Sequence, residues 1–585
     1  MSRAPAPARD ATTGFLRALV DEWARAGVRD ACLAPGSRSG PLALALAGDD
    51  RLRVHVHLDE RSAAFFALGL AKADRRPVIV LSTSGTAPAH FHPAVLEAHH
   101  GRVPLVVCSA DRPPELRDTG AGQTIDQVGL YGGAVRWACD VEAPADRPGA
   151  GATWRAIAAR AAAAATGPPP GPVHLNLAFR EPLVATGAPP VAAPGRADGR
   201  PWVAVTASAA PADDATVDRL AALVARSRRG MLVAGWGASV SEETAARFAG
   251  ACGWPVLADP ISGLRVGGHA VSTYEALLRV PGFADAHRPD LVLRVGAPPT
   301  SKLLGGWLDS AVPQIVVDPD RAWLDPARAA AEIVVADAEP LLVALADRLP
   351  GPAPPDGAWL AGWQAAEAAA RAALDAALDG DPQSECRVAR DLVAGLPDGA
   401  TLLVASSMPV RDVESFAAPR AGLRFLANRG VNGIDGLVST VLGAAASPDA
   451  GPVVGLLGDL AFLHDVGGLA SPAARAVDAT FVVIDNDGSG IFSFLPQAQL
   501  LDPDGAHFEA LFGTPHGLDL ATMAAAYGAH AVRADDATVL QSVAAAIAAG
   551  GVQMVLVRSD RPAHVSRHEA AWQAVARSVT PLNPT

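Results

Sequence analysis

Short runs of β-branched and other apolar residues alternate with longer stretches rich in Ala and Leu along most of the 585-residue chain. Apolar runs of this length are typical of strands buried in a parallel sheet, and the stretches between them have the length of crossover helices. The pattern therefore predicts an α/β protein with doubly wound parallel sheets. The predicted strands are 30–34, 54–58, 78–83, 105–110, 230–234, 255–258, 291–295, 314–317, 401–406, 423–426, 453–458, 479–485 and 552–558.

Segments rich in Pro, Gly and Ala divide this pattern at 167–172, at about 184–201 and at 349–355. Pro-rich segments act as semi-rigid connectors. At about 150 residues per domain, a chain of this length needs several cores. We therefore expect three α/β domains, at 1–190, 200–350 and 380–585. An Ala-rich helix that runs to about Asp379 is expected to lead into the third.

Composition narrows the class of protein. Hydrophobic residues make up 50% of the chain and charged residues 19%, which excludes global disorder. The chain lacks an uncharged apolar run of about 18 residues, so we expect no membrane span. The net charge of −13 disfavours nucleic acid and anionic lipid as partners. An anionic substrate would need locally concentrated Arg and Lys.

The cysteines and the N-terminus indicate a reducing compartment. The chain has five cysteines, far apart and without a C-x-x-C motif, which argues against a disulfide framework or a structural zinc site. Residues 1–7 include no apolar segment typical of a leader peptide. We expect a cytoplasmic protein.

Two of the predicted strands end in residues that suit a metal ion. One run ends in Gly458-Asp459, and a later run is followed by Asn486 and Gly488. A right-handed crossover places both ends at one sheet edge, where open α/β sheets bind ligands. The Asp459 carboxylate, the Asn486 amide oxygen and a backbone carbonyl near Gly488 would offer Mg²⁺ three oxygen ligands. Each motif alone is an ordinary turn, and only the pair predicts a metal site.

An isolated glutamate, Glu60, stands between the predicted strand 54–58 and a predicted helix at 61–72. Its local context fits an exposed residue in a first helical turn, where the helix dipole favours a carboxylate. The residues around it do not assign it any chemistry.

The paired strand ends resemble the cofactor motif of thiamine diphosphate enzymes. The resemblance implies three domains of that type, with thiamine diphosphate held through Mg²⁺ or, as a second choice, Mn²⁺. Glu60 resembles the catalytic glutamate that hydrogen-bonds N1′ of the aminopyrimidine. In those enzymes this glutamate and the diphosphate site come from different subunits. A homodimer or homotetramer with active sites at the subunit interface is therefore expected.

Longer segments across the chain resemble one family within that class, the 2-succinyl-5-enolpyruvyl-6-hydroxy-3-cyclohexene-1-carboxylate synthases. The string Asp-Arg-Pro-Pro-Glu-Leu at 111–116 is the most specific of them. The resemblance implies decarboxylation of 2-oxoglutarate and 1,4-addition of the succinyl semialdehyde unit to isochorismate, in menaquinone biosynthesis. The matching segments are 34–39, 83–87, 110–116, 179–183, 428–430, 433–436 and 508–517.

The same resemblance assigns roles to individual residues. Arg binds carboxylates through two parallel hydrogen bonds, as two dicarboxylate substrates require. The implied substrate-binding residues are Ser37, Arg38, Arg112, Gln123, Lys302, Arg411, Arg429, Ile491 and Phe492. The implied cofactor-binding residues are Glu60, Ser407, Ile434, Gly458, Asp459, Leu460 and Asn486, with Asp459, Asn486 and Gly488 on the metal. The chain departs from the family pattern at His90, His92, Gly122 and Leu303.

Three other functions stay open at this point. The chain could be another thiamine diphosphate carboligase, such as an acetohydroxyacid synthase, although the several site arginines disfavour small monoanionic substrates. It could be an FAD-bearing 2-oxoacid oxidase, which would be yellow. It could also be a catalytically silent subunit, against which the presence of Glu60, Asp459 and Asn486 argues.

Overall fold

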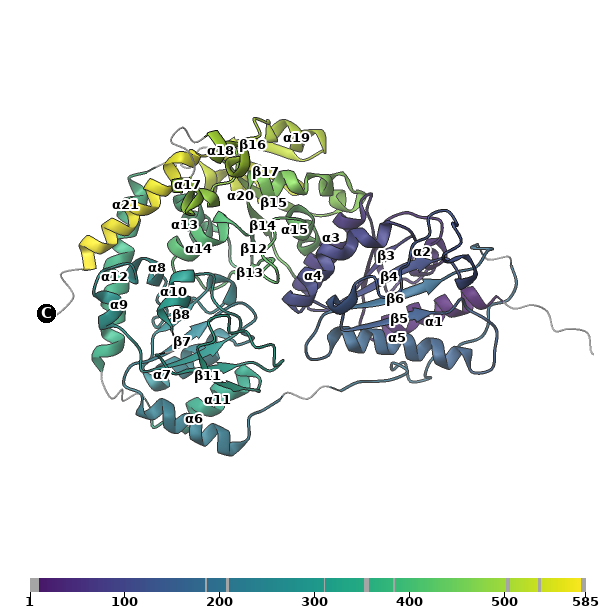
Figure 1. The fold of residues 1–585 in the computed structure, drawn as a ribbon, viewed down its shortest axis with the longest axis horizontal. Helices are drawn as coiled ribbons and strands as arrows, with labels where there is room; N and C mark the ends of the chain where they lie inside the picture. Colours follow the sequence, from purple (N-terminus) through teal and green to yellow (C-terminus); the bar gives the residue numbers. More distant parts are fainter. Residues whose placement is uncertain are drawn as a thin grey trace, which may run out of the picture.

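The computed structural model describes residues 10–184, 187–206, 210–309, 311–351, 357–381, 384–500, 506–534 and 538–579. Three parallel sheets follow one another along the chain, each covered by helices on both faces (Figure 1). The prediction of three doubly wound α/β domains is confirmed. The exact domain limits stay a prediction.

The first sheet has the strand order β2-β1-β3-β4-β6-β5. Its core lies on both faces, with α1, α2 and α5 packed on one side and α3 and α4 on the other. The strands are β1 (Asp30–Leu33), β2 (Arg53–Val56), β3 (Val78–Ser82), β4 (Leu105–Asp111), β5 (Trp137–Val141) and β6 (Pro172–Ala178). The helices are α1 (Ala11–Arg25), α2 (Gly40–Ala47), α3 (Glu60–Asp74), α4 (His92–Gly101) and α5 (Ala150–Thr166).

The second sheet has the order β11-β10-β9-β7-β8. Helices α6, α7 and α11 pack on one face, and α8, α9, α10 and the connector α12 on the other. The strands are β7 (Gly230–Ala234), β8 (Val256–Ala258), β9 (Leu291–Val295), β10 (Gln314–Val317) and β11 (Ala330–Val334). The helices are α6 (Asp214–Arg226), α7 (Glu242–Cys252), α8 (Tyr274–Leu277), α9 (Phe283–Ala286), α10 (Lys302–Trp307), α11 (Ala338–Arg348) and α12 (Gly357–Asp379).

The third sheet has the order β13-β12-β14-β15-β17-β16. Helices α13, α14 and α20 pack on one face, and α15, α16 and α19 on the other. The strands are β12 (Thr401–Val404), β13 (Arg424–Leu426), β14 (Val453–Gly458), β15 (Ala479–Asp485), β16 (His530–Ala534) and β17 (Val552–Arg558). The helices are α13 (Glu385–Gly395), α14 (Met408–Phe416), α15 (Leu437–Ala445), α16 (Asp459–His464), α17 (Gln497–Leu500), α18 (Ala506–Phe508), α19 (Leu520–Ala526), α20 (Val539–Ala549) and α21 (Arg561–Val579).

The sequence pattern did not predict β5, β6, β11 and β16. Three of these, β5, β11 and β16, are edge strands with partly exposed residues, so they lack the continuous apolar run of a central strand. Strand β6 is fully buried but begins at Pro172, inside the Pro-rich segment whose composition predicts a connector. The connector helix predicted to end near Asp379 is confirmed as α12.

The first and third domains share a core where α3 crosses α15 (Figure 1). Glycines make the close approach of the two helices feasible. A Cβ atom at Gly443 of α15 would lie 1.9 Å from the carbonyl oxygen of Phe66, and one at Gly69 of α3 would lie 2.0 Å from that of Thr440. Either methyl group would therefore have to push the helix backbones apart.

The structure contains no helix, within the ranges described above, that is long and apolar enough to cross a membrane.

We predict that Gly443→Ala lowers stability by about 1–3 kcal/mol, because its methyl group collides with backbone rather than with a movable side chain. Gly250→Ala is the matched control, since Gly250 lies in α7 and a Cβ atom added there would have nothing within 4 Å. Ala is the better helix former by about 1 kcal/mol, so the control should unfold at or above the wild-type midpoint. Thermal unfolding of both variants tests this, and equal midpoints would contradict the close crossing.

Candidate active site

The two strand ends singled out in the sequence meet at one sheet edge. Strands β14 and β15 are parallel neighbours, with Gly458 opposite Ile484. Asp459 begins α16, and its Oδ2 accepts hydrogen bonds from the backbone N–H groups of Asn486 at 3.1 Å and Gly488 at 2.9 Å. Gly488 has φ of 138°, and a Cβ atom there would lie 2.1 Å from the Gly513 carbonyl oxygen. The close turn thus requires glycine.

The side chain of Asn486 is oriented by a residue outside the predicted motif. Its Nδ2 donates to Oε1 of Glu385, the first residue of α13, at 2.9 Å. This leaves the Asn486 Oδ1 buried without a hydrogen-bond partner among the residues described. A buried amide oxygen without a donor is costly, and a cation beside it would remove the cost. The donor set therefore fits a hard divalent cation.

Charge is concentrated at the same edge. Burial raises the pKa of the Asp459 carboxyl, and hydrogen bonds from the backbone of Gly488 and Leu460 oppose that shift. The Nε2 of His516 lies 3.3 Å from Asp459 Oδ2 and 3.9 Å from Asp485 Oδ1. Sequence reasoning matched the segment 508–517 to the family but gave His516 no role. The histidine reaches the site only through the fold.

Glu60 is the first residue of α3 and is half-buried. Asp59 caps the helix by accepting from the N–H groups of Arg61 and Ser62. Arg61 in turn donates to the carbonyl oxygen of His464, at the far end of α16 from Asp459. Within the described ranges, no hydrogen bond or ion pair joins Glu60 to the Asp459–Asn486 edge.

Part of the predicted substrate set gathers around Ser84, beyond the ends of β3 and β4. Arg112 donates to the Ser84 hydroxyl, and Gln123 Nε2 donates to the Ser84 carbonyl oxygen at 3.0 Å. Burial lowers the pKa of Arg112, and the nearby charge of Arg38 lowers it further. Arg38 is 8% exposed, donates to the carbonyl of Phe179 and pairs with the exposed Glu181. The predicted Ser37, beside Arg38, is exposed.

A second cationic group lies between the middle and C-terminal domains. Arg429 donates to the hydroxyl of Thr300 at 3.2 Å, two residues before the exposed Lys302. Arg411 of α14 donates to the carbonyl of Ser407, whose backbone has the strained values φ 73° and ψ −133°. Burial lowers the pKa of Arg411, as does the positive charge of Arg429. The two predicted arginines of this domain are therefore neighbours.

The remaining predicted residues follow β14 and β15 in the chain or pack near the core shared by α3 and α15. Ile491 and Phe492 are half-buried in a short 3₁₀ helix after β15, and the Phe492 ring packs edge-on against Phe512. Ile434 is half-buried against the shared core of α3 and α15. Leu460 follows Asp459 and donates its N–H to the Asp459 carboxylate at 2.6 Å.

Four residues depart from the family pattern, and two of them pack against neighbouring side chains. His92 packs edge-on against Tyr131, and Leu303 packs against the middle-domain core. A Cβ atom added at Gly122 would have nothing within 4 Å. His90 is exposed.

The loop that carries Arg429 is fastened to the first domain by a buried ion pair. Glu97 accepts from the N–H groups of Gly430 at 2.9 Å and Val431 at 2.8 Å. Lys72 donates to Glu97 at 3.1 Å and to the Asn428 side chain at 2.9 Å. The pair therefore fixes the loop of Arg429 across the junction of two domains. Sequence reasoning missed both residues, because the loop they hold lies more than 300 positions away.

Comparison with known proteins defines the class. The chain matches "Thiamine pyrophosphate enzyme, N-terminal TPP binding domain" over residues 15–130, "Middle domain of thiamine pyrophosphate" over 196–404 and "Thiamine pyrophosphate enzyme, C-terminal TPP binding domain" over 412–558. Its fold is similar to the thiamine diphosphate-dependent 4-hydroxybenzoylformate decarboxylase of Rhodococcus jostii RHA1, with a TM-score of 0.72 and 18% identity over 93% of this chain and 99% of that one. The chain is a thiamine diphosphate enzyme.

Relatives in sequence are more specific. The chain is 47% identical to a protein of Thermobifida fusca over 97% of this chain and 99% of the relative. It is 45% identical to one of Myxococcus xanthus and 44% to one of Chloroflexus aurantiacus, each over 97% of both chains. All three are named 2-succinyl-5-enolpyruvyl-6-hydroxy-3-cyclohexene-1-carboxylate synthase. The chain belongs to this family, which confirms the resemblance seen in the sequence.

We predict that Glu97→Gln destabilises the protein by about 1–3 kcal/mol, because Lys72 stays buried and loses its carboxylate partner. Adding Lys72→Met should restore part of the loss by removing the unpaired ammonium. Glu115→Gln, which breaks an exposed pair with Arg180, is the matched control and should leave the thermal midpoint nearly unchanged. Indistinguishable midpoints for Glu97→Gln and Glu115→Gln would rule out the fastening role.

Proposed function

We propose that this chain decarboxylates 2-oxoglutarate and adds the resulting succinyl semialdehyde unit to isochorismate in a 1,4-sense. The product would be 2-succinyl-5-enolpyruvyl-6-hydroxy-3-cyclohexene-1-carboxylate, a precursor in menaquinone biosynthesis. The observation that carries the proposal is the near-full-length identity of 44–47% to synthases of that name, with Glu60, Asp459 and Asn486 all present. A cytoplasmic location stays a prediction.

The cofactor would bind at the end of β14 and β15. Asp459, Asn486 and the backbone at Gly488 would hold Mg²⁺, or Mn²⁺ in its place, and the metal would hold the diphosphate. The buried Asn486 Oδ1 without a donor supports this assignment. Gly458 and Leu460 would lie beside the phosphates, with Ser407 and Ile434 beside the rest of the cofactor. Bound thiamine diphosphate supplies the electron sink that decarboxylation of a 2-oxo acid requires.

Glu60 would hold a proton between its carboxyl group and N1′ of the aminopyrimidine, the interaction that activates the cofactor in this class. The lack of any hydrogen bond between Glu60 and the Asp459 edge within the described part of one chain favours a site completed by a second copy. We therefore propose a homodimer, or a homotetramer built from it, with Glu60 facing the partner's diphosphate site.

The arginines would bind the carboxylates of the two substrates. Within the described ranges, Arg112, Arg411 and Arg429 form no ion pair and donate instead to the neutral oxygens of Ser84, Ser407 and Thr300. None of the three is therefore in direct contact with a carboxylate among the described residues. Arg38 has one carboxylate partner, the exposed Glu181. Ser37, Gln123 and Lys302 would add polar contacts.

The apolar side chains Ile434, Ile491 and Phe492 would exclude water from the reacting carbon. Excluding water matters, because protonation of the reacting carbon would release succinic semialdehyde before the second substrate reacts. Positioning two bound anions next to each other would supply most of the remaining rate enhancement.

The first experiment is an assay of purified protein with thiamine diphosphate, Mg²⁺ and 2-oxoglutarate, with and without isochorismate. We expect isochorismate-dependent formation of the succinyl adduct, identified by its mass. Succinic semialdehyde without adduct would point to a different acceptor. Activity with pyruvate alone would favour an acetohydroxyacid synthase, a yellow FAD-containing protein would favour the oxidase, and no cofactor binding would favour a silent subunit.

We predict that Glu60→Gln slows hydrogen exchange at C2 of bound thiamine diphosphate by about 10²–10⁴-fold, the usual contribution of general acid–base catalysis. Binding of the Mg²⁺–diphosphate part should survive, since Glu60 lies apart from Asp459. Exchange followed by NMR and cofactor binding followed by calorimetry separate the two effects. Glu115→Gln, at an exposed site, is the control. Wild-type exchange in Glu60→Gln would refute the assignment.

We predict that Arg411→Ala raises the KM of one dicarboxylate substrate at least about tenfold, the loss of roughly one charge-assisted hydrogen-bonded pair. Arg411→Lys should recover only part of the loss, because an ammonium cannot form the two parallel bonds. Arg180→Ala, at an exposed pair, is the matched control. Unaltered saturation curves for both substrates in Arg411→Ala would reject the role.

A further inference from the structure

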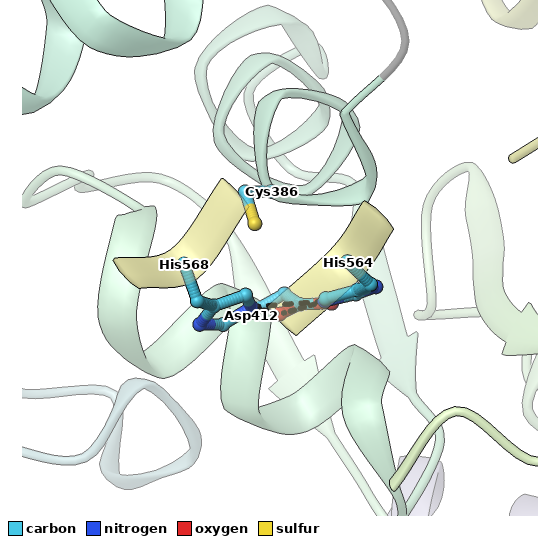
Figure 2. A group of neighbouring side chains, drawn as sticks. All are labelled: Cys386, Asp412, His564 and His568. Atoms are coloured by element: carbon cyan, nitrogen blue, oxygen red, sulfur yellow. Dashed lines mark hydrogen bonds and ion pairs between the residues drawn. The ribbon is translucent and has the colours of Figure 1, made fainter. Parts of the chain in front are cut away.

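A second cluster of metal-binding side chains lies behind the candidate active site. Cys386 comes from the start of α13, Asp412 from α14, and His564 and His568 from successive turns of α21 (Figure 2). One ligand atom from each residue lies within 4.8 Å of all the others. The four residues are 1–2% exposed. None of them belongs to the predicted active site.

The two histidine nitrogens that face each other cannot both carry a proton. His564 Nε2 and His568 Nε2 are 2.9 Å apart, and the rings are stacked with an interplanar angle of 21°. Both nitrogens also face Oδ1 of Asp412, at 3.5 Å and 2.8 Å (Figure 2). Two N–H groups at this separation would repel each other, so at least one nitrogen must offer a lone pair. A metal ion accepts the lone pairs of both.

We propose that Cys386, Asp412, His564 and His568 bind one Zn²⁺ ion. Zn²⁺ takes thiolate, imidazole and carboxylate ligands at about 2.0–2.3 Å, and four protein ligands leave no position for substrate or water. The site is therefore structural and not catalytic. Two histidines four positions apart on a helix, as on α21, present their nitrogens to one ion.

The charges of the cluster match a divalent cation. A thiolate and a carboxylate contribute two negative charges, and two neutral imidazoles contribute none, so Zn²⁺ makes the buried site neutral. The charge balance and the convergence of the four ligand atoms therefore both fit a single divalent ion.

The thiolate and the closed, oxygen-poor ligand set select the metal. Mg²⁺ prefers oxygen ligands and retains waters, which a buried Cys-His-His-Asp set does not supply. Three aromatic rings pack against the histidines and exclude solvent. They are Phe416 and Trp572, which contact His568, and Phe494, which contacts both histidines.

Glu385 connects this cluster to the candidate active site. Its Oε2 lies 2.8 Å from His564 Nδ1, within ion-pair distance but without hydrogen-bond geometry. On a metal-bound histidine this carboxylate would be the outer partner of the ring. Its Oε1 accepts from Asn486 Nδ2 at 2.9 Å. A zinc ion would therefore fix Glu385, and through it the direction of Asn486 Oδ1. This link, unlike the zinc site itself, rests on the proposed function.

The test uses the full-length protein prepared without a metal-affinity tag, loaded with Zn²⁺ and dialysed against buffer with excess Mg²⁺, without cofactor or substrate. We expect one zinc ion per chain by mass spectrometry. Co²⁺ loaded instead should give the strong visible bands of four-coordinate cobalt and a thiolate-to-cobalt charge-transfer band. Excess Mg²⁺ keeps Co²⁺ from the oxygen ligands of Asp459.

Cys386→Ser should lose the charge-transfer band, whereas Cys139→Ser, a half-buried thiol elsewhere, should keep it and its zinc. If Cys386→Ser does not fold, the wild-type cobalt spectrum decides alone. No retained zinc in wild type, which would leave a metal-free histidine pair, overturns the proposal. A wild-type cobalt spectrum without the thiolate band overturns it too. Neither result depends on the synthase assay, so each proposal can fail separately.

Discussion

The carboxylate of Asp459 sets the geometry on which the rest of the candidate site depends. It is 2% exposed and accepts backbone hydrogen bonds from its own helix and from the loop after the neighbouring strand. A buried carboxylate is costly without donors, so these backbone groups must stay in place whenever it is ionised. The end of β14 and the turn at Asn486 are thereby held as one unit. Glu385 extends this unit by fixing the Asn486 amide.

The residues of the candidate site come from all three domains, and two junctions hold these domains together. The glycine crossing of α3 and α15 brings the helix that begins with Glu60 against the domain that carries Asp459. The ion pair of Lys72 and Glu97 fastens the loop of Arg429 to that same helix layer. Junctions of this kind would hold the residues that each copy is proposed to contribute at fixed positions within that copy.

The sequence alone was sufficient for features that are local. Asp459 and Asn486 each follow an apolar strand directly, so the parallel-sheet rule could bring them together before the structure was known. Glu60 could be assigned only by resemblance, because nothing near it in sequence distinguishes it from an ordinary first-turn glutamate. The edge strands β5, β11 and β16 were missed because their exposed sides weaken the apolar signal.

Long-range partners were not predictable in this way. Glu385, His516 and Glu97 act on residues at least 57 positions away. The wide spacing of the cysteines argued against a structural zinc site. That argument recognises only sites whose ligands are close together in sequence, and the proposed site is not of that kind. Cys386 lies at the start of the third domain in sequence and the two histidines on its last helix, and the fold brings them together. Only the pair of histidines on α21 carried a local signal.

An acidic chain that binds two dicarboxylates must avoid neutralising its own cations. Some other buried arginines have a carboxylate partner, as Arg155 has Glu22 and Arg294 has Asp325. Arg265, by contrast, donates to backbone carbonyls and to the Tyr274 hydroxyl. Arg112, Arg411 and Arg429 donate to neutral oxygens, which hold the guanidinium groups in place but leave their charge available. Burial and the positive charge of Arg429 lower the pKa of Arg411. Both effects destabilise the charged guanidinium group, so an anion bound beside it would stabilise it. On the proposed function, the cost of holding like charges together would contribute to the affinity for the substrates.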